Sequence, residues 1–153
     1  GEPQVPDLEN EALRDGPKPF AVQIRKAVDQ RSYVLNEISR LVREEGILPN
    51  EIGILHEQKH VLDRYRGRVP RGVHIYEVKK QTGLEYRAVF IPELEDMIDR
   101  DSSLNWEVDQ AHKLVKLYSA ATRARSRLYL LHKGEWPTPF MHMVPFFDRI
   151  APR

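Results

Sequence analysis

The sequence contains no cysteine, which excludes disulfide bonds and any zinc site built from thiolate ligands. It has no apolar run that approaches the roughly 20 residues of a transmembrane helix, and we expect no contact with a membrane. Its first residues lack the basic, apolar and small-residue segments that follow one another in a secretory signal peptide. Together these absences predict a cytoplasmic protein.

Neither sign of charge is in excess. Lysine and arginine total 24 and aspartate and glutamate total 23, which gives a formal net charge of +1. A uniformly basic coat protein for nucleic acid is therefore excluded. Any contact with nucleic acid must come from local clusters, such as Lys79 with Lys80 or the run of Arg123, Arg125 and Arg127.

A phosphate-binding P-loop is also missing. The pattern G-x-x-x-x-G-K-[ST] does not occur, and no glycine is followed by lysine. That pattern forms the loop that holds the β- and γ-phosphates of a nucleotide together with Mg²⁺. We therefore expect this chain to be unable to hydrolyse ATP alone.

The chain has the length and apolar content of one domain. Of its 153 residues 41% are apolar, which is enough for one sizeable core. Residues 1–18 are rich in proline, glycine and acidic residues, and we expect them to form an extended N-terminal segment. Residues 19–153 are expected to form a single domain.

Short apolar runs alternate with segments of helical periodicity. Runs bounded by turn residues predict strands at residues 20–24, 52–55, 73–78, 88–91 and 128–131. Apolar residues three or four positions apart predict helices within residues 29–46, 61–65 and 114–121. Asp29 is expected to cap the start of the first helix and Gly46 its end. This alternation is typical of an α/β fold with a largely parallel sheet and helices on both faces.

Two further segments have a distinctive composition. Residues 93–101 are acidic, and we expect them to be an excursion on the surface. Aromatic residues near the C-terminus predict a tail helix packed on the core, with an exposed binding patch as the alternative. These aromatic residues are Trp136, Phe140, Phe146 and Phe147.

Residues 117–131, LYSAATRARSRLYLL, combine the end of an amphipathic helix with an apolar strand. This segment resembles motif VI of UvrD/Rep-type superfamily 1 DNA helicases. The matching positions are Tyr118, Thr122, Arg123, Ala124 and Arg125. Outside that context, Arg123 would be interpreted as a cation that complements the C-terminus of a helix.

Residues 78–94, VKKQTGLEYRAVFIPEL, resemble motif V of the same family through Gly83, Leu84, Glu85 and Tyr86 and the apolar strand that follows. The two motifs stand in the order and at the spacing of the family. The resemblance covers roughly residues 19–141 of this sequence.

The sequence departs from the family at several positions. Glu77, Lys79 and Thr82 stand where motif V usually has threonine, histidine and lysine. Glu57 takes the place of an arginine that often follows the strand at residues 52–55. The large helical insertion that many members carry after this region is missing.

The resemblance implies a RecA-like domain of the P-loop NTPase type, the second of two motor domains and without its own P-loop. ATP and Mg²⁺ would be bound mainly by an N-terminal RecA-like domain of the same native protein. Arg123 would be the arginine finger, a planar guanidinium that stabilises charge developing on the γ-phosphate. Gly83, Glu85 and Arg125 would also contact the nucleotide. Because ligands of parallel α/β sheets bind at the carboxyl ends of strands, we expect both motifs at that edge.

The partner implied by the resemblance is single-stranded DNA, along which ATP hydrolysis would move the protein. Lys79, Lys80 and Thr82 are the candidate DNA contacts, with an ordinary solvated loop as the alternative. A second hypothesis is a non-catalytic remnant of a helicase domain that binds nucleic acid or protein. The departures in motif V motivate it.

A third hypothesis comes from His56-Glu57-Gln58-Lys59-His60, which matches the H-E-x-x-H pattern of zinc peptidases. That chemistry needs both histidines one turn apart on a helix and a third ligand, for which Glu77 or Glu85 are candidates. His56 directly follows a predicted strand, and Lys59 would place a cation beside the metal. Two histidines in the first turn of a helix, without metal, are the simpler interpretation, and we expect no metal ligand in the site.

Overall fold

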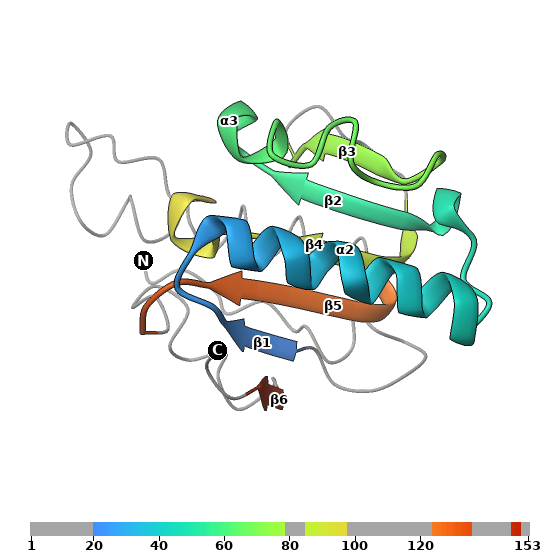
Figure 1. Cartoon of the computed structure of the whole chain (residues 1–153), viewed down its shortest axis with the longest axis horizontal. Coiled ribbons are helices and arrows are strands. Elements are labelled where there is room, and N and C mark those ends of the chain that lie inside the picture. Colours follow the sequence, from blue (N-terminus) through green and yellow to red (C-terminus); the bar gives the residue numbers. More distant parts are fainter. Residues whose placement is uncertain (1–19, 79–84, 98–123, 136–147, 151–153) are drawn as a thin grey trace, which may run out of the picture.

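A computed structural model of the chain describes residues 20–78, 85–97, 124–135 and 148–150, and these residues form one parallel sheet with a long helix lying across it (Figure 1). The elements, in chain order, are β1 (Phe20–Gln23), α2 (Ala27–Glu44), η1 (Pro49–Glu51), β2 (Ile52–His56), α3 (Lys59–Leu62), β3 (His74–Glu77), β4 (Tyr86–Ile91), η3 (Leu94–Met97), β5 (Ala124–His132) and β6 (Asp148–Ile150).

The six strands follow the order β3-β2-β4-β5-β1-β6, and each pairing between neighbours is parallel. The long central strand β5 pairs with β4 on one side and with β1 on the other, where Phe20 is opposite Tyr129. The predicted α/β fold with a parallel sheet is therefore confirmed. The carboxyl ends of all these strands meet at one edge of the sheet, and their amino ends meet at the opposite edge.

The core forms between the sheet and α2. Val34, Ile38 and Leu41 recur at helical spacing on one face of α2 and are fully buried. They pack with residues such as Ile54 and Phe90 from the central strands. Burial of each such side chain stabilises the fold by about 1.5–3 kcal/mol relative to exposure.

The ends of α2 differ in part from the prediction. The helix begins at Ala27 after Lys26, whose extended backbone occupies the capping position, so Asp29 lies in the first turn and does not cap the helix. Gly46 ends the helix as predicted, with a φ of +69° that glycine adopts without strain. The N–H groups of Glu45 and Ile47 both donate to the carbonyl of Leu41.

The sheet is buried on both faces. Val89, Ile91, Leu128 and Leu130 alternate with the residues that face α2, and they too are fully buried. Such two-sided burial is typical of the central strands of parallel α/β sheets. The helix predicted within residues 114–121, which would supply a second covering helix, lies outside the described residues.

Three expectations need correction or cannot be placed. The short strand β6 was not predicted, and the aromatic residues assigned to a tail helix lie outside the described residues. Glu93 is buried, and so are Leu94 and Met97, which means that this part of the acidic stretch is not a surface excursion. The N-terminal segment, residues 1–18, is also outside the described residues.

Among the described helices, none is long and apolar enough to cross a membrane.

Candidate functional site

The sheet brings parts of the motif V and motif VI segments together at its amino edge. Glu85 is the last residue before β4, and Arg125 is the second residue of β5. The register places Tyr86 opposite Ala124, and adjacent strands lie about 4.8 Å apart. The expectation that these motifs lie at the carboxyl ends of strands is therefore wrong for Glu85 and Arg125. The reason is that Glu85 immediately precedes β4 and Arg125 stands at the start of β5, and the amino ends of parallel strands share one edge.

Glu85 is exposed at this edge. The other predicted contacts with nucleotide or DNA lie outside the described residues, so the structure does not test their positions. These residues are Lys79, Lys80, Thr82, Gly83 and Arg123.

Tyr86, the aromatic residue of motif V, anchors the strand that follows Glu85. Its ring lies against Gly53 of β2, so closely that a Cβ at Gly53 would be 3.0 Å from Cδ2 of Tyr86. Its hydroxyl lies 3.3 Å from Nδ1 of His74 in β3, and the two rings meet edge to face. Gly53 is therefore needed for the close approach of Tyr86. Through these contacts Tyr86 ties β4 to β2, its neighbour in the sheet, and to β3, the next strand beyond.

Ion pairs near the C-terminal end of α2 hold Arg127 of β5. Its guanidinium donates to Glu45, and this contact lowers the pKa of the Glu45 carboxyl. Arg40 lies between Glu45, at 2.8 Å, and Glu37, at 2.5 Å. Hydrogen bonding to Glu37 raises the pKa of Arg40 above its ordinary value. Arg127 therefore belongs to an intramolecular network, and the proposal that it joins a basic DNA-binding run with Arg123 and Arg125 is not supported.

Tyr129 extends this network into the sheet. Its hydroxyl donates to Oε2 of Glu37 at 2.8 Å, and its ring stacks on Phe90. Burial raises the pKa of Tyr129, and the nearby carboxylate of Glu37 raises it further. The contact fastens α2 to the central strand of the sheet.

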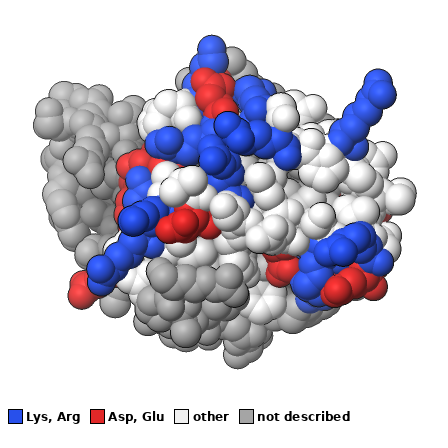
Figure 2. All heavy atoms as spheres, in the orientation of Figure 1, with Lys and Arg blue, Asp and Glu red and all other residues white. Residues whose placement is uncertain are grey.

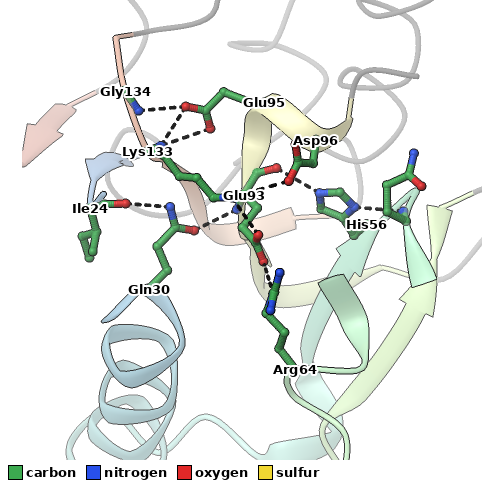
Figure 3. A network of polar contacts seen from close by, with 10 residues as sticks. Ile24, Gln30, His56, Arg64, Glu93, Glu95, Asp96, Lys133 and Gly134 are labelled. Carbon is green, nitrogen blue, oxygen red and sulfur yellow. Dashed lines mark hydrogen bonds and ion pairs between the residues drawn. The ribbon is translucent and has the colours of Figure 1, made fainter. Parts of the chain in front are cut away.

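A second polar cluster lies at the carboxyl edge and centres on Glu93 (Figure 3). The side chain of Glu93 is only 1% exposed, and its Oε2 accepts a hydrogen bond of 2.8 Å from Nε of Arg64. Its Oε1 lies 3.0 Å from Nζ of Lys133, at ion-pair distance but without the alignment of a hydrogen bond. Two cations thus neutralise a carboxylate that would be costly to bury alone.

The backbone of Glu93 is held as firmly as its side chain. Its N–H donates to Oε1 of Gln30 at 2.8 Å, and Nε2 of Gln30 donates to the carbonyl of Ile24 at the end of β1. Glu93 has a φ of +45°, a left-handed conformation that costs a residue with a side chain roughly 1 kcal/mol or more. The surrounding contacts maintain this strained conformation.

Lys133 joins the same cluster to η3. Its Nζ lies 3.6 Å from Asp96, while its backbone N–H and that of Gly134 donate to the carboxylate of Glu95. Burial acts to lower the pKa of Lys133, but the carboxylates of Glu93 and Asp96 outweigh burial and raise it. Lys133 is therefore a cation in the folded protein.

His56, the last residue of β2, uses both ring nitrogens in this cluster. Nδ1 accepts from the N–H of Gln58 at 2.9 Å, so Nε2 carries the proton and donates to the carbonyl of Glu93 at 3.1 Å. Burial lowers the pKa of His56 to about 4, which keeps the ring neutral.

The zinc-peptidase hypothesis fails on this geometry. His56 is in a strand and fully buried, whereas His60 is exposed on α3, which begins only at Lys59. The two histidines therefore do not share a helix. In the part of the chain that the structure describes, no group of three or more potential ligands is arranged to hold a metal.

The cluster around Glu93 was missed by reasoning from the sequence. Its members are far apart in the chain, yet a signal was present: Glu93 and Lys133 each follow an apolar strand run within two residues. In a parallel sheet such residues meet at the carboxyl edge. Because the acid is already neutralised by two cations of the same chain, the cluster acts as a junction between elements and has no acid or base set up for catalysis.

The described residues define an α/β protein with the parallel sheet of a RecA-like domain. Among solved structures, the chain resembles the C-terminal domain of a possible DNA helicase from Lactobacillus plantarum WCFS1, with a TM-score of 0.67. The alignment covers 93% of this chain and 91% of that one at 14% sequence identity. At this identity the likeness shows a shared fold. No family model matches the sequence, and no curated protein does.

Proposed function

We propose that this chain is the C-terminal motor domain of an ATP-dependent DNA helicase or translocase of the UvrD/Rep type. The observation that carries the proposal is the pairing of Tyr86 with Ala124, which aligns the strands that follow the two helicase-like motifs. The fold shared over 93% of this chain with the C-terminal domain of a possible DNA helicase supports it. In this proposal the ATP site is shared with an N-terminal RecA-like domain, which binds most of ATP and Mg²⁺.

Arg123 immediately precedes Ala124, the first residue of β5. In the proposed site its guanidinium is the arginine finger that stabilises charge on the γ-phosphate during transfer to water. Gly83, Glu85 and Arg125 assist by contacting the nucleotide. The glycine permits close approach of the backbone, and the carboxylate of Glu85 accepts hydrogen bonds from the ribose or organises the phosphate side.

Single-stranded DNA is the proposed track. Lys79, Lys80 and Thr82 are the candidate contacts, and ammonium and hydroxyl groups at these positions suit the phosphate backbone. The two domains would open and close around ATP, and each cycle would move the protein along the strand.

The test is the ATPase activity of the native full-length protein, with and without single-stranded DNA. Replacement Arg123→Ala should lower stimulated turnover by about 10³- to 10⁵-fold without unfolding the protein. Arg43→Ala is the matched control, because Arg43 is an exposed arginine in the last turn of α2. Unchanged turnover in Arg123→Ala would exclude the finger assignment.

The second candidate is a non-catalytic module that retains the helicase fold and binds nucleic acid or protein. The substitutions at Glu77, Lys79 and Thr82 relative to motif V favour it. A full-length protein without any P-loop, or without DNA-stimulated ATPase activity, would support this module over the motor.

A further inference from the structure

One segment of the chain concentrates positive charge. Residues 59–71 contain five lysines and arginines and one acid, Asp63. Figure 2 shows lysine and arginine side chains gathered over α3 and the N-terminal half of α2. We call Lys59 of α3 and Arg66 and Arg68 of the turn that follows it the basic surface.

These cations are available to a partner. Lys59 and Arg68 are exposed and form no ion pair with any residue that the structure describes. Arg66 is 47% exposed, and among the described residues its ion-pair partner is the similarly exposed Asp63, three residues earlier, at 3.0 Å. An exposed pair of this kind is weak and competes poorly with a multivalent anion.

The turn that carries the basic surface is held in place. Tyr65 is fully buried, its N–H donates to the carbonyl of Leu62, and its carbonyl accepts from the N–H of Arg68. Arg64 is fixed at the other side of the turn by its hydrogen bond to the buried Glu93. Arg66 and Arg68 therefore extend from a constrained backbone, which reduces the entropy lost on binding.

The chemistry of the basic surface fits a phosphate backbone. The guanidinium groups of arginine bind phosphate oxygens in a bidentate manner. Among the described residues the exposed large apolar side chains are Val28 and Leu48, so no exposed Phe, Tyr or Trp ring adjoins the basic surface as a platform for unstacked bases; the exposed ring beside it is the small imidazole of His60. It also lacks the aromatic anchors that dominate protein interfaces.

We propose that the basic surface binds the phosphate backbone of duplex DNA, at a place separate from the single-strand contacts of the motif V segment. A duplex presents one charge per roughly 1.7 Å of helix axis and needs no stacking platform. That the duplex is DNA rests on the proposed helicase function. The phosphate chemistry follows from the exposed cations themselves, of which Lys59 and Arg68 have no ion pair within the described residues and Arg66 has a weak, exposed one.

The test is fluorescence anisotropy of the 153-residue chain with a labelled duplex DNA, titrated at several KCl concentrations, beside a single strand and a duplex RNA of the same length. The variant is Arg66→Ala with Arg68→Ala. The matched control is Arg43→Ala with Arg71→Ala, two exposed arginines away from α3: Arg43 lies in the last turn of α2, and Arg71 precedes Gly72, which lies against Pro49 before the start of β2. Circular dichroism verifies that both variants are folded.

Loss of two phosphate contacts should lower the slope of log K against log [KCl] by about 2 and weaken duplex binding at low salt by about tenfold or more. The control should bind like the wild type. Duplex binding by the variant equal to that of the wild type, an equal loss in the control, or tighter binding of single-stranded DNA or duplex RNA than of duplex DNA would overturn the proposal.

The two proposals fail separately. ATP turnover that does not need Arg123 would exclude the finger assignment, and the absence of DNA-stimulated ATPase activity would exclude the motor function. Either result would leave the anisotropy result intact. Unchanged duplex binding in the Arg66 and Arg68 variant would remove the basic surface and leave the ATPase result intact.

Discussion

The carboxylate of Glu93 lies 2.8 Å from Nε of Arg64, and this buried contact joins the end of β4 to the turn after α3. Lys133 approaches the same carboxylate from the end of β5 at 3.0 Å. Arg64 and Lys133 are 39% and 35% exposed, so solvent reaches both cations but hardly reaches the acid. Both cations therefore compensate the cost of burying the carboxylate of Glu93.

Replacement Glu93→Gln should destabilise the protein, because it leaves two cations without their acid and keeps a strained backbone. Breaking a fully buried pair costs about 3–5 kcal/mol, and the partial exposure of Arg64 and Lys133 reduces the expected loss to about 2 kcal/mol. Urea unfolding measures it. Asp63→Asn, which removes the exposed partner of Arg66, should change stability by less than about 0.5 kcal/mol. Equal effects of the two substitutions would contradict a special role for burial.

The neutral His56 should make stability depend on pH. Its folded pKa of about 4 lies below the ordinary value of 6.5, so the unfolded chain binds the proton more readily. The contribution is fully present above pH 6.5 and is lost as the pH falls from 6.5 towards 4. Between pH 7 and pH 5 the free energy of unfolding should fall by about 2 kcal/mol from this residue.

The measurement for His56 is urea unfolding at pH 7 and pH 5 for the wild type and His56→Gln. The variant should be less stable at pH 7 but should lose less stability on acidification, because it cannot take up the proton. A variant whose loss between the two pH values equals that of the wild type would show that other groups carry the pH dependence.

Gly53→Ala should destabilise the protein because the added methyl group would meet the ring of Tyr86 at about 3.0 Å. Overpacking of this kind costs about 1–3 kcal/mol. Tyr86→Leu removes the obstructing ring, so Gly53→Ala should cost much less in that background. The coupling is obtained from a double-mutant cycle by urea unfolding. Additive losses would mean that the close approach is not the reason for the glycine.

Arg127 and Arg123 should behave differently although they belong to one basic run. Arg127 pairs with Glu45, so Arg127→Ala should cost at most about 1 kcal/mol of stability and leave ATP turnover unchanged. Arg123→Ala should abolish turnover without a comparable loss of stability. ATPase assays and urea unfolding of both variants decide this. A large loss of turnover in Arg127→Ala would place the nucleotide nearer to the C-terminal end of α2.

The strands and α2 could be predicted from the sequence because their apolar residues repeat with the period of each element. Phe90 and Ile91, for example, lie in a continuous apolar run that becomes the buried strand β4. The start of α2 was less certain, because a residue such as Asp29 can cap a helix or sit in its first turn. In the structure the backbone of Lys26 is extended and the helix begins at Ala27, which puts Asp29 in the first turn.

The burial of Glu93 could not be predicted, because it depends on cations distant in the chain. Arg64 is 29 residues away, and the residue lies in a stretch whose composition indicates exposure. The edge at which the motifs lie was predictable in principle, since Glu85 and Arg125 stand before and at the start of their strands. The rule that ligands bind at the carboxyl ends of parallel strands predicted the opposite edge, whereas the order of the residues in the chain indicates the amino edge.

The order of the strands also constrains how the chain folds. β5 lies between β4 and β1 in the sheet, and Phe20 of β1 pairs with Tyr129 of β5, which is far from it in the sequence. Contacts between residues so distant in sequence slow folding, because a long loop must close before they form. During synthesis β1 and α2 therefore leave the ribosome long before the strand that connects them to β2 and β4. Until β5 emerges, the apolar face of α2 lacks the central part of its sheet, and exposed apolar surface of this kind promotes aggregation.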